Sequence, residues 1–349
     1  MSAATNPLHG THDDASPNVS SQTFTIAGLL VTVFGLNELP SNPSSVACLW
    51  LLHPRLQTRE TMAPLAAQVI SEWTRPQSRT PKNSKGLIAV AFDQRNHGSR
   101  NVDKLHNEAW RQGNPRHAQD MFGCYHGTAV DTSHLIDHLE SYIFNTPGAP
   151  SITQHIALGV SLGGHATWHC LLSDPRITAG VVGIGCPDYT RLMTDRARLS
   201  KRTTYTGTSP PGAAFLGSPD FPPALRDAVA KSDPAGLLLP GMFNPTGADP
   251  QPDAALLERF RTLLGERLQG KRILNLSGRD DKLVPYAAGE PFLKVFKKML
   301  AENPGLDIAF EDVLFDGVGH AFPKAMADKA TAWICELLRS EGKGGASKI

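Results

Sequence analysis

The sequence has few cysteines and no excess of charge of either sign. Its five cysteines are odd in number and scattered, with no Cys-x-x-Cys pair. This is typical of reduced, mostly buried thiols in an intracellular protein and argues against a disulfide framework. Lysine and arginine (34) almost balance aspartate and glutamate (33), so the formal net charge is +1. We therefore expect no broad attraction to nucleic acid or to an anionic membrane surface.

Long hydrophobic segments are also missing. The longest apolar run, Ile26 to Leu36, is too short to span a bilayer and contains two glycines and a threonine. Residues 1–21 are polar and lack the apolar core of a signal peptide, so we interpret them as a flexible tail. These features predict an intracellular, cytoplasmic protein with no integral membrane segment.

Sequence patterns for cofactor and metal binding are missing as well. The chain has no phosphate-binding loop and no dinucleotide fingerprint. Two histidine pairs four residues apart, His134/His138 and His165/His169, lack the glutamate of a His-Glu-x-x-His zinc motif. We interpret them as residues that pack on helix faces, and we predict that the protein uses neither a cofactor nor a metal.

The chain instead contains alternating strand-like and helix-like segments. At 349 residues with 40% hydrophobic residues it can form one large core. We predict strands at residues 23–34 (one strand or a pair), 46–52, 86–92, 156–158, 177–184, 272–276 and 306–315, and helices at 59–73, 128–143, 162–173, 291–301 and 322–339. This alternation predicts an α/β fold, with a mostly parallel sheet and helices on both faces.

Two stretches interrupt this alternation. Residues 187–270 are rich in proline, glycine, serine and arginine and include short helical pieces at 222–231 and 254–268. We interpret them as a cap inserted between strands six and seven, which divides the core into residues 22–186 and 271–340. Residues 99–125 form a second, polar insertion, and its Trp110, Met121 and Phe122 predict that it packs on the rest of the protein.

The C-terminal residues 341–349 look like a flexible tail. They end in Ser347-Lys348-Ile349, which resembles the peroxisomal address Ser-Lys-Leu with isoleucine in place of leucine. The alternative is a chance tripeptide, so a peroxisomal location stays open beside a cytoplasmic one.

A serine between two glycines is the most informative motif. The apolar run Ile156 to Leu158 leads into Gly159-Val160-Ser161-Leu162-Gly163 and then into a helical segment. Glycines on both sides of a serine fit a sharp turn from strand to helix, where larger side chains would collide with neighbouring elements. Such a turn exposes the hydroxyl, so Ser161 is a candidate nucleophile.

A serine nucleophile needs a base and a third group that orients the base. In a sheet of this topology these groups follow later strands, in the order serine, acid, histidine. Asp280 and Asp281 follow the seventh predicted strand, and His320 follows the eighth. The three loops thus contain all the groups that acyl transfer through a serine requires.

With these motifs, residues 22–340 resemble the α/β-hydrolase superfamily, specifically its carboxylesterase and dienelactone-hydrolase-like branches. The resemblance implies an eight-stranded sheet. It also implies that the acid is Asp281, four residues before Pro285, with Asp280 as the alternative.

The same resemblance locates the donors for the oxyanion of the reaction. One is the N–H of Leu162, directly after the nucleophile. The second should follow the third strand, where the chain reads His53-Pro54-Arg55-Leu56. Proline has no N–H, so the donor is Arg55, with Leu56 as the alternative.

Four further residues are candidates for substrate contacts: His53, Arg95, His97 and Trp110. The segment Asp93 to Gly98 is similar to the Asp-x-Arg-Asn-His-Gly turn of some esterases. There the turn shapes the floor of the site, so Arg95 and His97 are first of all scaffold residues. His53 has the alternative role of a structural hydrogen bond.

The combined features predict a serine hydrolase that cleaves a small ester, lactone or thioester through Ser161, His320 and Asp281. Relatives that open epoxides or displace halide have aspartate as the nucleophile at this strand-to-helix turn, which we call the elbow. Ser161 therefore argues against both reactions. Three alternatives stay open: an acyltransferase, a C–C hydrolase or lyase acting on a diketone, and a non-catalytic binding protein. The predicted partner is a small acyl substrate, and homodimerisation is left open.

Overall fold

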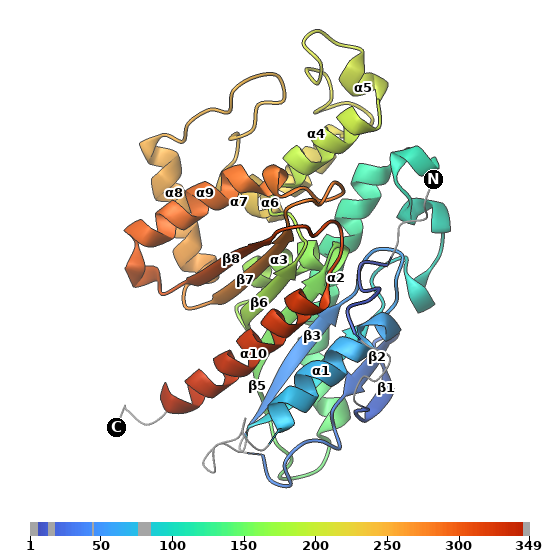
Figure 1. The fold of residues 1–349 in the computed structure, drawn as a ribbon, viewed down its shortest axis with the longest axis vertical. Coiled ribbons are helices and arrows are strands. Elements are labelled where there is room, and N and C mark those ends of the chain that lie inside the picture. Colours follow the sequence, from blue (N-terminus) through green and yellow to red (C-terminus); the bar gives the residue numbers. More distant parts are fainter. Residues whose placement is uncertain (1–5, 13–17, 44, 76–84, 345–349) are drawn as a thin grey trace.

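The computed structural model describes residues 6–12, 18–43, 45–75 and 85–344. An eight-stranded sheet lies at its centre, with the strand order β1-β2-β4-β3-β5-β6-β7-β8 (Figure 1). The strands are β1 (Ser21–Ile26), β2 (Leu29–Phe34), β3 (Val46–Leu52), β4 (Gly86–Phe92), β5 (Ile152–Val160), β6 (Ile177–Gly183), β7 (Arg272–Gly278) and β8 (Ala309–Phe315). Only the β1–β2 and β2–β4 pairs are antiparallel. The predicted mostly parallel, eight-stranded sheet is confirmed.

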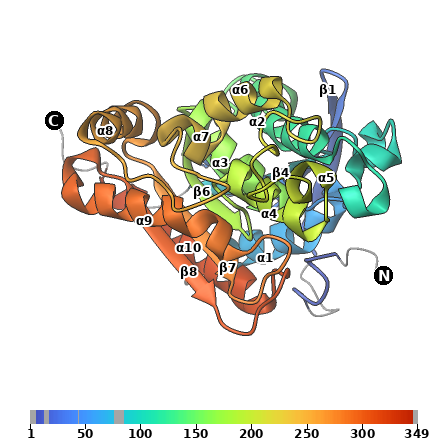
Figure 2. The same cartoon turned by 90° about the horizontal axis from the view of Figure 1, so that it is seen from above.

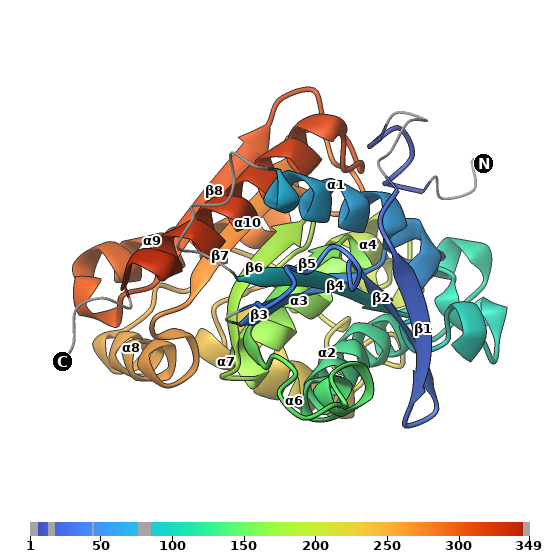
Figure 3. The same ribbon diagram turned by 90° about the horizontal axis from the view of Figure 1, so that it is seen from below.

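Helices cover both faces of the sheet. They are α1 (Ala63–Thr74), α2 (His117–Ile143), α3 (Leu162–Ser173), α4 (Tyr189–Leu199), α5 (Thr203–Thr206), α6 (Pro223–Ser232), α7 (Pro234–Leu238), α8 (Ala254–Leu268), α9 (Tyr286–Glu302) and α10 (Lys324–Gly344). Figure 3 shows α1 and α10 on one side of the sheet and α2 and α3 on the other. The central strands β3 to β7 are therefore buried between two helical layers, whereas the edge strands β1 and β8 are mostly exposed or half-buried.

Strand β3 shows why its sequence is a continuous apolar run. Every residue of this strand is buried. Cys48 and Trp50 belong to the core on the α2/α3 side, whereas Leu49 and Leu51 belong to the core on the α1/α10 side. Because successive side chains point to opposite faces, a strand covered on both faces needs apolar residues at every position.

Two helices begin earlier than the sequence predicts. Helix α2 begins at His117, although the apolar spacing predicted Thr128, so the polar insertion includes the first turns of this helix. Its Met121 and Phe122 are buried, as expected. Helix α9 begins at Tyr286 and contains Pro291, which was predicted as its first residue. Pro291 removes one backbone donor from the helix, yet α9 continues through it to Glu302.

Five helices lie between β6 and β7. Of these, α8 packs on α3 and buries Phe260, Leu264 and Leu268, so it is the crossover helix that parallel strands need. Figure 2 looks onto the end of the molecule where α4, α5 and α6 lie. The interpretation of residues 187–270 as a cap stays a prediction.

The N-terminal segment contacts the loop that follows His320. The N–H of Phe322 donates to the Pro7 carbonyl at 2.8 Å, and the Thr11 hydroxyl donates to the Phe322 carbonyl at 2.6 Å. Residues 6–12 therefore differ from the flexible tail expected there. The tripeptide Ser347 to Ile349 lies outside the described residues.

The helices can also be compared with what a membrane-spanning helix requires. In the described part of the chain, no helix combines the length and the apolarity needed to cross a bilayer. All five cysteines are free, and four of them are buried.

Candidate active site

Ser161 sits at the sharp turn between β5 and α3. Its backbone angles are φ 56° and ψ −111°, a region that residues with a Cβ rarely adopt. The turn is possible because its neighbours are glycines. A Cβ on Gly159 would lie 2.0 Å from the Gly163 carbonyl oxygen, and one on Gly163 would lie 1.9 Å from the Leu52 carbonyl oxygen. The glycines therefore let α3 start directly against the end of β3.

Replacing Gly163 by alanine is expected to lower the free energy of unfolding by about 3 kcal/mol or more, because the new methyl group must push β3 and α3 apart. Urea unfolding would measure the loss. Gly123→Ala is the matched control, since Gly123 lies in α2 and a Cβ there meets nothing within 4 Å. That change should leave stability equal or slightly higher, as alanine favours a helix. Equal stability of Gly163→Ala and the unmodified protein would contradict the tight contact.

A continuous chain of hydrogen bonds leads away from Ser161. The Ser161 hydroxyl lies 2.9 Å from His320 Nε2, and His320 Nδ1 lies 2.8 Å from Asp281 Oδ2. Since an aspartate oxygen accepts, Nδ1 carries the proton and Nε2 is free to accept from the serine hydroxyl. The structure brings these three residues together in the predicted order.

The Asp281 carboxylate is fixed by the backbone around it. Its Oδ1 accepts from the N–H groups of Leu283 and Val284, both at 2.8 Å, and the residue is 3% exposed. Asp280, the sequence alternative, is exposed and bonds through its backbone N–H to the Val318 carbonyl. The geometry favours Asp281 as the partner of the imidazole.

Two backbone N–H groups near Ser161 have the character of oxyanion donors. Leu162 is the first residue of α3, where an N–H has no partner within the helix. Arg55 lies three residues beyond Leu52, whose carbonyl contacts the start of α3. Among the described residues neither N–H donates to a protein acceptor. Both groups are therefore available to a ligand.

His53 holds the loop after β3 in shape. It is fully buried, and its Nε2 accepts from the Gln94 N–H at 2.9 Å while Nδ1 donates to the Pro54 carbonyl at 2.7 Å. Burial, with a smaller effect of nearby His97, lowers the pKa of His53 to about 3. The ring is neutral, and both nitrogens bind the backbone.

The other three candidates for substrate contacts also bind protein groups. Arg95 pairs with Asp131 through two hydrogen bonds of 3.2 and 2.9 Å. His97 is 3% exposed and donates from Nδ1 to the Arg95 carbonyl at 2.9 Å. Trp110 packs edge-on against Phe215, with ring centroids 6.2 Å apart. In the described structure none of the three bonds to Ser161 or His320.

Sequence reasoning missed Arg196, which reaches the site from α4. Its Nη2 donates to the Leu283 carbonyl at 3.0 Å, next to the acid loop. Its Nη1 lies 3.2 Å from His117 Nε2 and 3.0 Å from Met121 Sδ. No sequence signal distinguished this arginine, because it lies in the irregular region of residues 187–270.

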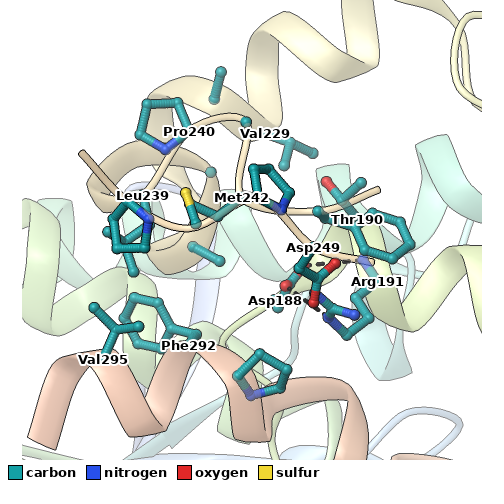
Figure 4. Close-up of a pocket in the computed structure, with 18 of the residues that line it drawn as sticks. Asp188, Thr190, Arg191, Val229, Leu239, Pro240, Met242, Asp249, Phe292 and Val295 are labelled. Carbon is teal, nitrogen blue, oxygen red and sulfur yellow. Dashed lines mark hydrogen bonds and ion pairs between the residues drawn. The ribbon is translucent and has the colours of Figure 1, made fainter. Parts of the chain in front are cut away.

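A separate pocket lies between residues 188–252 and α9 (Figure 4). Its volume is about 590 Å³. Leu239, Met242 and Phe292 line its apolar part, and Arg191 and Asp249 form an ion pair at its polar end. Ser161, Asp281 and His320 are not among its lining residues, so it is distinct from the site at the elbow.

The two predicted histidine pairs pack inside the fold or along α2. His165 Nδ1 donates to the Ser161 carbonyl at 2.8 Å, and burial lowers the pKa of His165 to about 3. His134 and His138 face each other edge-on along α2. Within the described ranges, no cluster of three or more His, Cys, Asp or Glu side chains is arranged to hold a metal ion.

Comparison with solved structures shows what this architecture is similar to. The TT1662 protein of Thermus thermophilus is 19% identical, with a TM-score of 0.52, over 92% of this chain and 98% of that one. A putative dipeptidyl aminopeptidase IV of Bacteroides ovatus is 13% identical, with a TM-score of 0.50, over 93% of this chain and 36% of that one. These similarities concern the fold. No curated protein matches the sequence.

The family comparison covers most of the chain. The profile of the alpha/beta hydrolase family matches residues 53–332. This range includes the elbow at Ser161, the acid loop at Asp281 and His320. The chain therefore belongs to the alpha/beta hydrolase family, and its membership supports a hydrolase.

Proposed function

We propose that the protein is a serine hydrolase that cleaves a small ester, lactone or thioester through a covalent acyl-enzyme. The observation that carries the proposal is the hydrogen-bonded chain from Ser161 through His320 to Asp281, with distances of 2.9 and 2.8 Å. A hydroxyl within reach of a base that is itself oriented by a buried carboxylate is the arrangement that activates serine.

The first half of the reaction forms the acyl-enzyme. His320 Nε2 takes the Ser161 proton as Oγ attacks the acyl carbon, and Asp281 stabilises the resulting imidazolium. The N–H groups of Leu162 and Arg55 donate to the oxyanion of the tetrahedral intermediate, a contribution of about 3 kcal/mol for one such donor. His320 then gives its proton to the leaving alcohol or thiol as the C–O or C–S bond breaks.

The second half releases the acid. Water replaces the leaving group, and His320 removes one of its protons as the water oxygen attacks the acyl carbon. The proton returns to Ser161 Oγ when the acyl–enzyme bond breaks. An acyltransferase would follow the same steps with an alcohol or thiol in place of water, and it stays the second candidate because the nucleophile and the base are the same.

Labelling with a fluorophosphonate probe tests the nucleophile. The unmodified protein should be labelled, and Ser161→Ala should not, because the probe needs an activated serine hydroxyl. Ser141→Ala is the matched control, since Ser141 is an exposed helical serine whose hydroxyl donates to the His138 carbonyl. That variant should be labelled like the unmodified protein. Absence of labelling on folded protein would overturn the proposal.

A panel of p-nitrophenyl esters of increasing acyl length then separates hydrolysis from transfer. Release of p-nitrophenol with equal release of acid supports a hydrolase. A large gain in rate on adding an alcohol, with the acyl group recovered on that alcohol, would favour transfer.

A further inference from the structure

Two arginine side chains near the predicted catalytic residues have no carboxylate partner within the described part of the chain. Arg196 bonds to a backbone carbonyl, to the imidazole of His117 and to the thioether of Met121. His117 donates from Nδ1 to the Glu108 carbonyl at 3.1 Å, so its Nε2 carries the lone pair that receives Arg196. All three partners are neutral. Arg196 Nε is buried and has no hydrogen-bond partner in the described structure.

Arg55 is the second of these arginines. Its Nη1 donates to the Asn107 carbonyl at 2.7 Å, again a neutral acceptor. Burial, followed by the positive charge of Arg196, lowers the pKa of Arg55 to about 10. Burial also lowers the pKa of Arg196. Both residues keep some exposed surface although protein largely surrounds them.

The neighbouring arginines show how unusual this arrangement is. Arg191, five residues before Arg196 on the same helix, pairs with Asp249 at 2.7 Å (Figure 4). Two more arginines near the end of α4 also have carboxylate partners, namely Arg198 with Asp195 at 2.6 Å and Arg202 with Asp220 at 2.7 Å. Arg196 instead bonds to the Leu283 carbonyl beside the acid loop and has no such partner among the described residues.

Both cations belong to segments that also hold predicted catalytic groups. The backbone N–H of Arg55 is a candidate oxyanion donor, and its side chain extends from the same loop. Arg196 bonds to Leu283, whose N–H holds Asp281. The positive charge of Arg196 also helps to lower the pKa of His165, which bonds to the Ser161 carbonyl. Two different segments of the chain therefore bring a guanidinium close to the predicted catalytic residues, and the charge of each arginine is close enough to affect the other.

Glu108 stabilises the charge of Arg55, and Asp281 and Asp195 that of Arg196, only from beyond ion-pair distance. Two cations that protein largely surrounds are costly, and an anion bound between them offsets that cost. A guanidinium presents a planar fork of donors that matches carboxylate and phosphate oxygens. We infer that the site takes an anionic ester, a substrate whose carboxylate or phosphate group is bound by Arg55 and Arg196 while Ser161 attacks its acyl carbon. This inference rests on the proposed function and adds the substrate class.

Pairs of esters that differ only in a charged group test the inferred preference for an anionic substrate. The first pair is mono-p-nitrophenyl glutarate and p-nitrophenyl pentanoate, which differ in a terminal carboxylate. The second pair, 4-acetoxybenzoate and 4-acetoxybenzamide, carries the same contrast in the alcohol part. The unmodified protein should have a higher kcat/KM for the anionic member of at least one pair, and that pair shows which side of the ester carries the anion.

Arg196→Met should reduce this preference about 30-fold or more, since losing one partner of a desolvated charge pair is costly. Arg196→Lys, which keeps the charge, should restore part of the preference, whereas a merely structural role predicts no such rescue. The matched control is Arg198→Met, because Arg198 is exposed and paired with Asp195 on the same helix. That change should leave the preference as it is.

Thermal unfolding of Ser161→Ala provides a measurement without turnover. Glutarate or inorganic phosphate should raise its Tm, and dimethyl glutarate should not. A response to only one of the two anions identifies which group the arginines prefer.

Three results would overturn the inference alone, provided that hydrolysis of p-nitrophenyl pentanoate depends on Ser161. They are no preference for either anionic ester, an unchanged preference in Arg196→Met, and no Tm response to either anion. Loss of Ser161-dependent hydrolysis for every ester, together with no fluorophosphonate labelling, would instead remove the proposed hydrolase function.

Discussion

Asp281→Asn is expected to lower kcat about 10⁴-fold, whereas Asp280→Asn should change it less than about threefold. The amide of asparagine can offer its N–H₂ to His320 Nδ1, which stabilises the tautomer whose proton is on Nε2. That tautomer cannot accept the Ser161 proton. Asp280 is exposed and only its backbone takes part in the loop, so the same change there leaves the imidazole untouched.

Steady-state hydrolysis of one p-nitrophenyl ester by the two variants and the unmodified protein measures the difference. Fluorophosphonate labelling rates provide a second readout of serine activation, and circular dichroism checks that both variants are folded. A large loss confined to Asp280→Asn would reverse the assignment of the acid. Equal small losses in both would mean that His320 does not depend on a carboxylate.

The fold could be predicted largely because parallel strands buried on two faces leave a plain sequence pattern. Val46 to Leu52 and Gly86 to Phe92 are continuous apolar runs, and both match the observed strands residue for residue. The start of α2 could not be predicted from apolar spacing. Its first turns carry polar residues on the exposed side, and a buried residue such as Met121 meets a partner far away in the sequence, the guanidinium of Arg196.

The hydrogen-bonded set of Ser161, His320 and Asp281 could be predicted because each residue lies in a local motif with its own backbone requirement. Ser161 stands between glycines that no other residue could replace without a clash. The role of Arg196 is different, since it depends on contacts with His117 and Leu283, which are 79 and 87 residues away in the sequence. Contacts between residues so far apart in the sequence arise from the way residues 187–270 pack on the rest of the protein. They leave no local sequence pattern.

Ser161→Ala and His320→Ala are each expected to lower kcat about 10⁶-fold, and the double variant should lose little more than either single one. The serine and the imidazole act as one unit, because the hydroxyl at 2.9 Å from Nε2 is a useful nucleophile only while that nitrogen accepts its proton. Once either is missing, the other has nothing to act on. The remaining rate comes from substrate binding and from the N–H groups of Leu162 and Arg55, which all three variants keep.

We expect kcat values of the three variants and the unmodified protein on one ester to give the coupling free energy between Ser161 and His320. Urea unfolding provides the control that the variants stay folded, since Ser161 is only 8% exposed and the His320 side chain 16%. His169→Ala is a useful comparison, because His169 is buried in α3 and has no bond to Ser161. It should affect stability more than the chemical step. Losses that multiply in the double variant would mean that Ser161 and His320 contribute independently, which the observed hydrogen bond between them argues against.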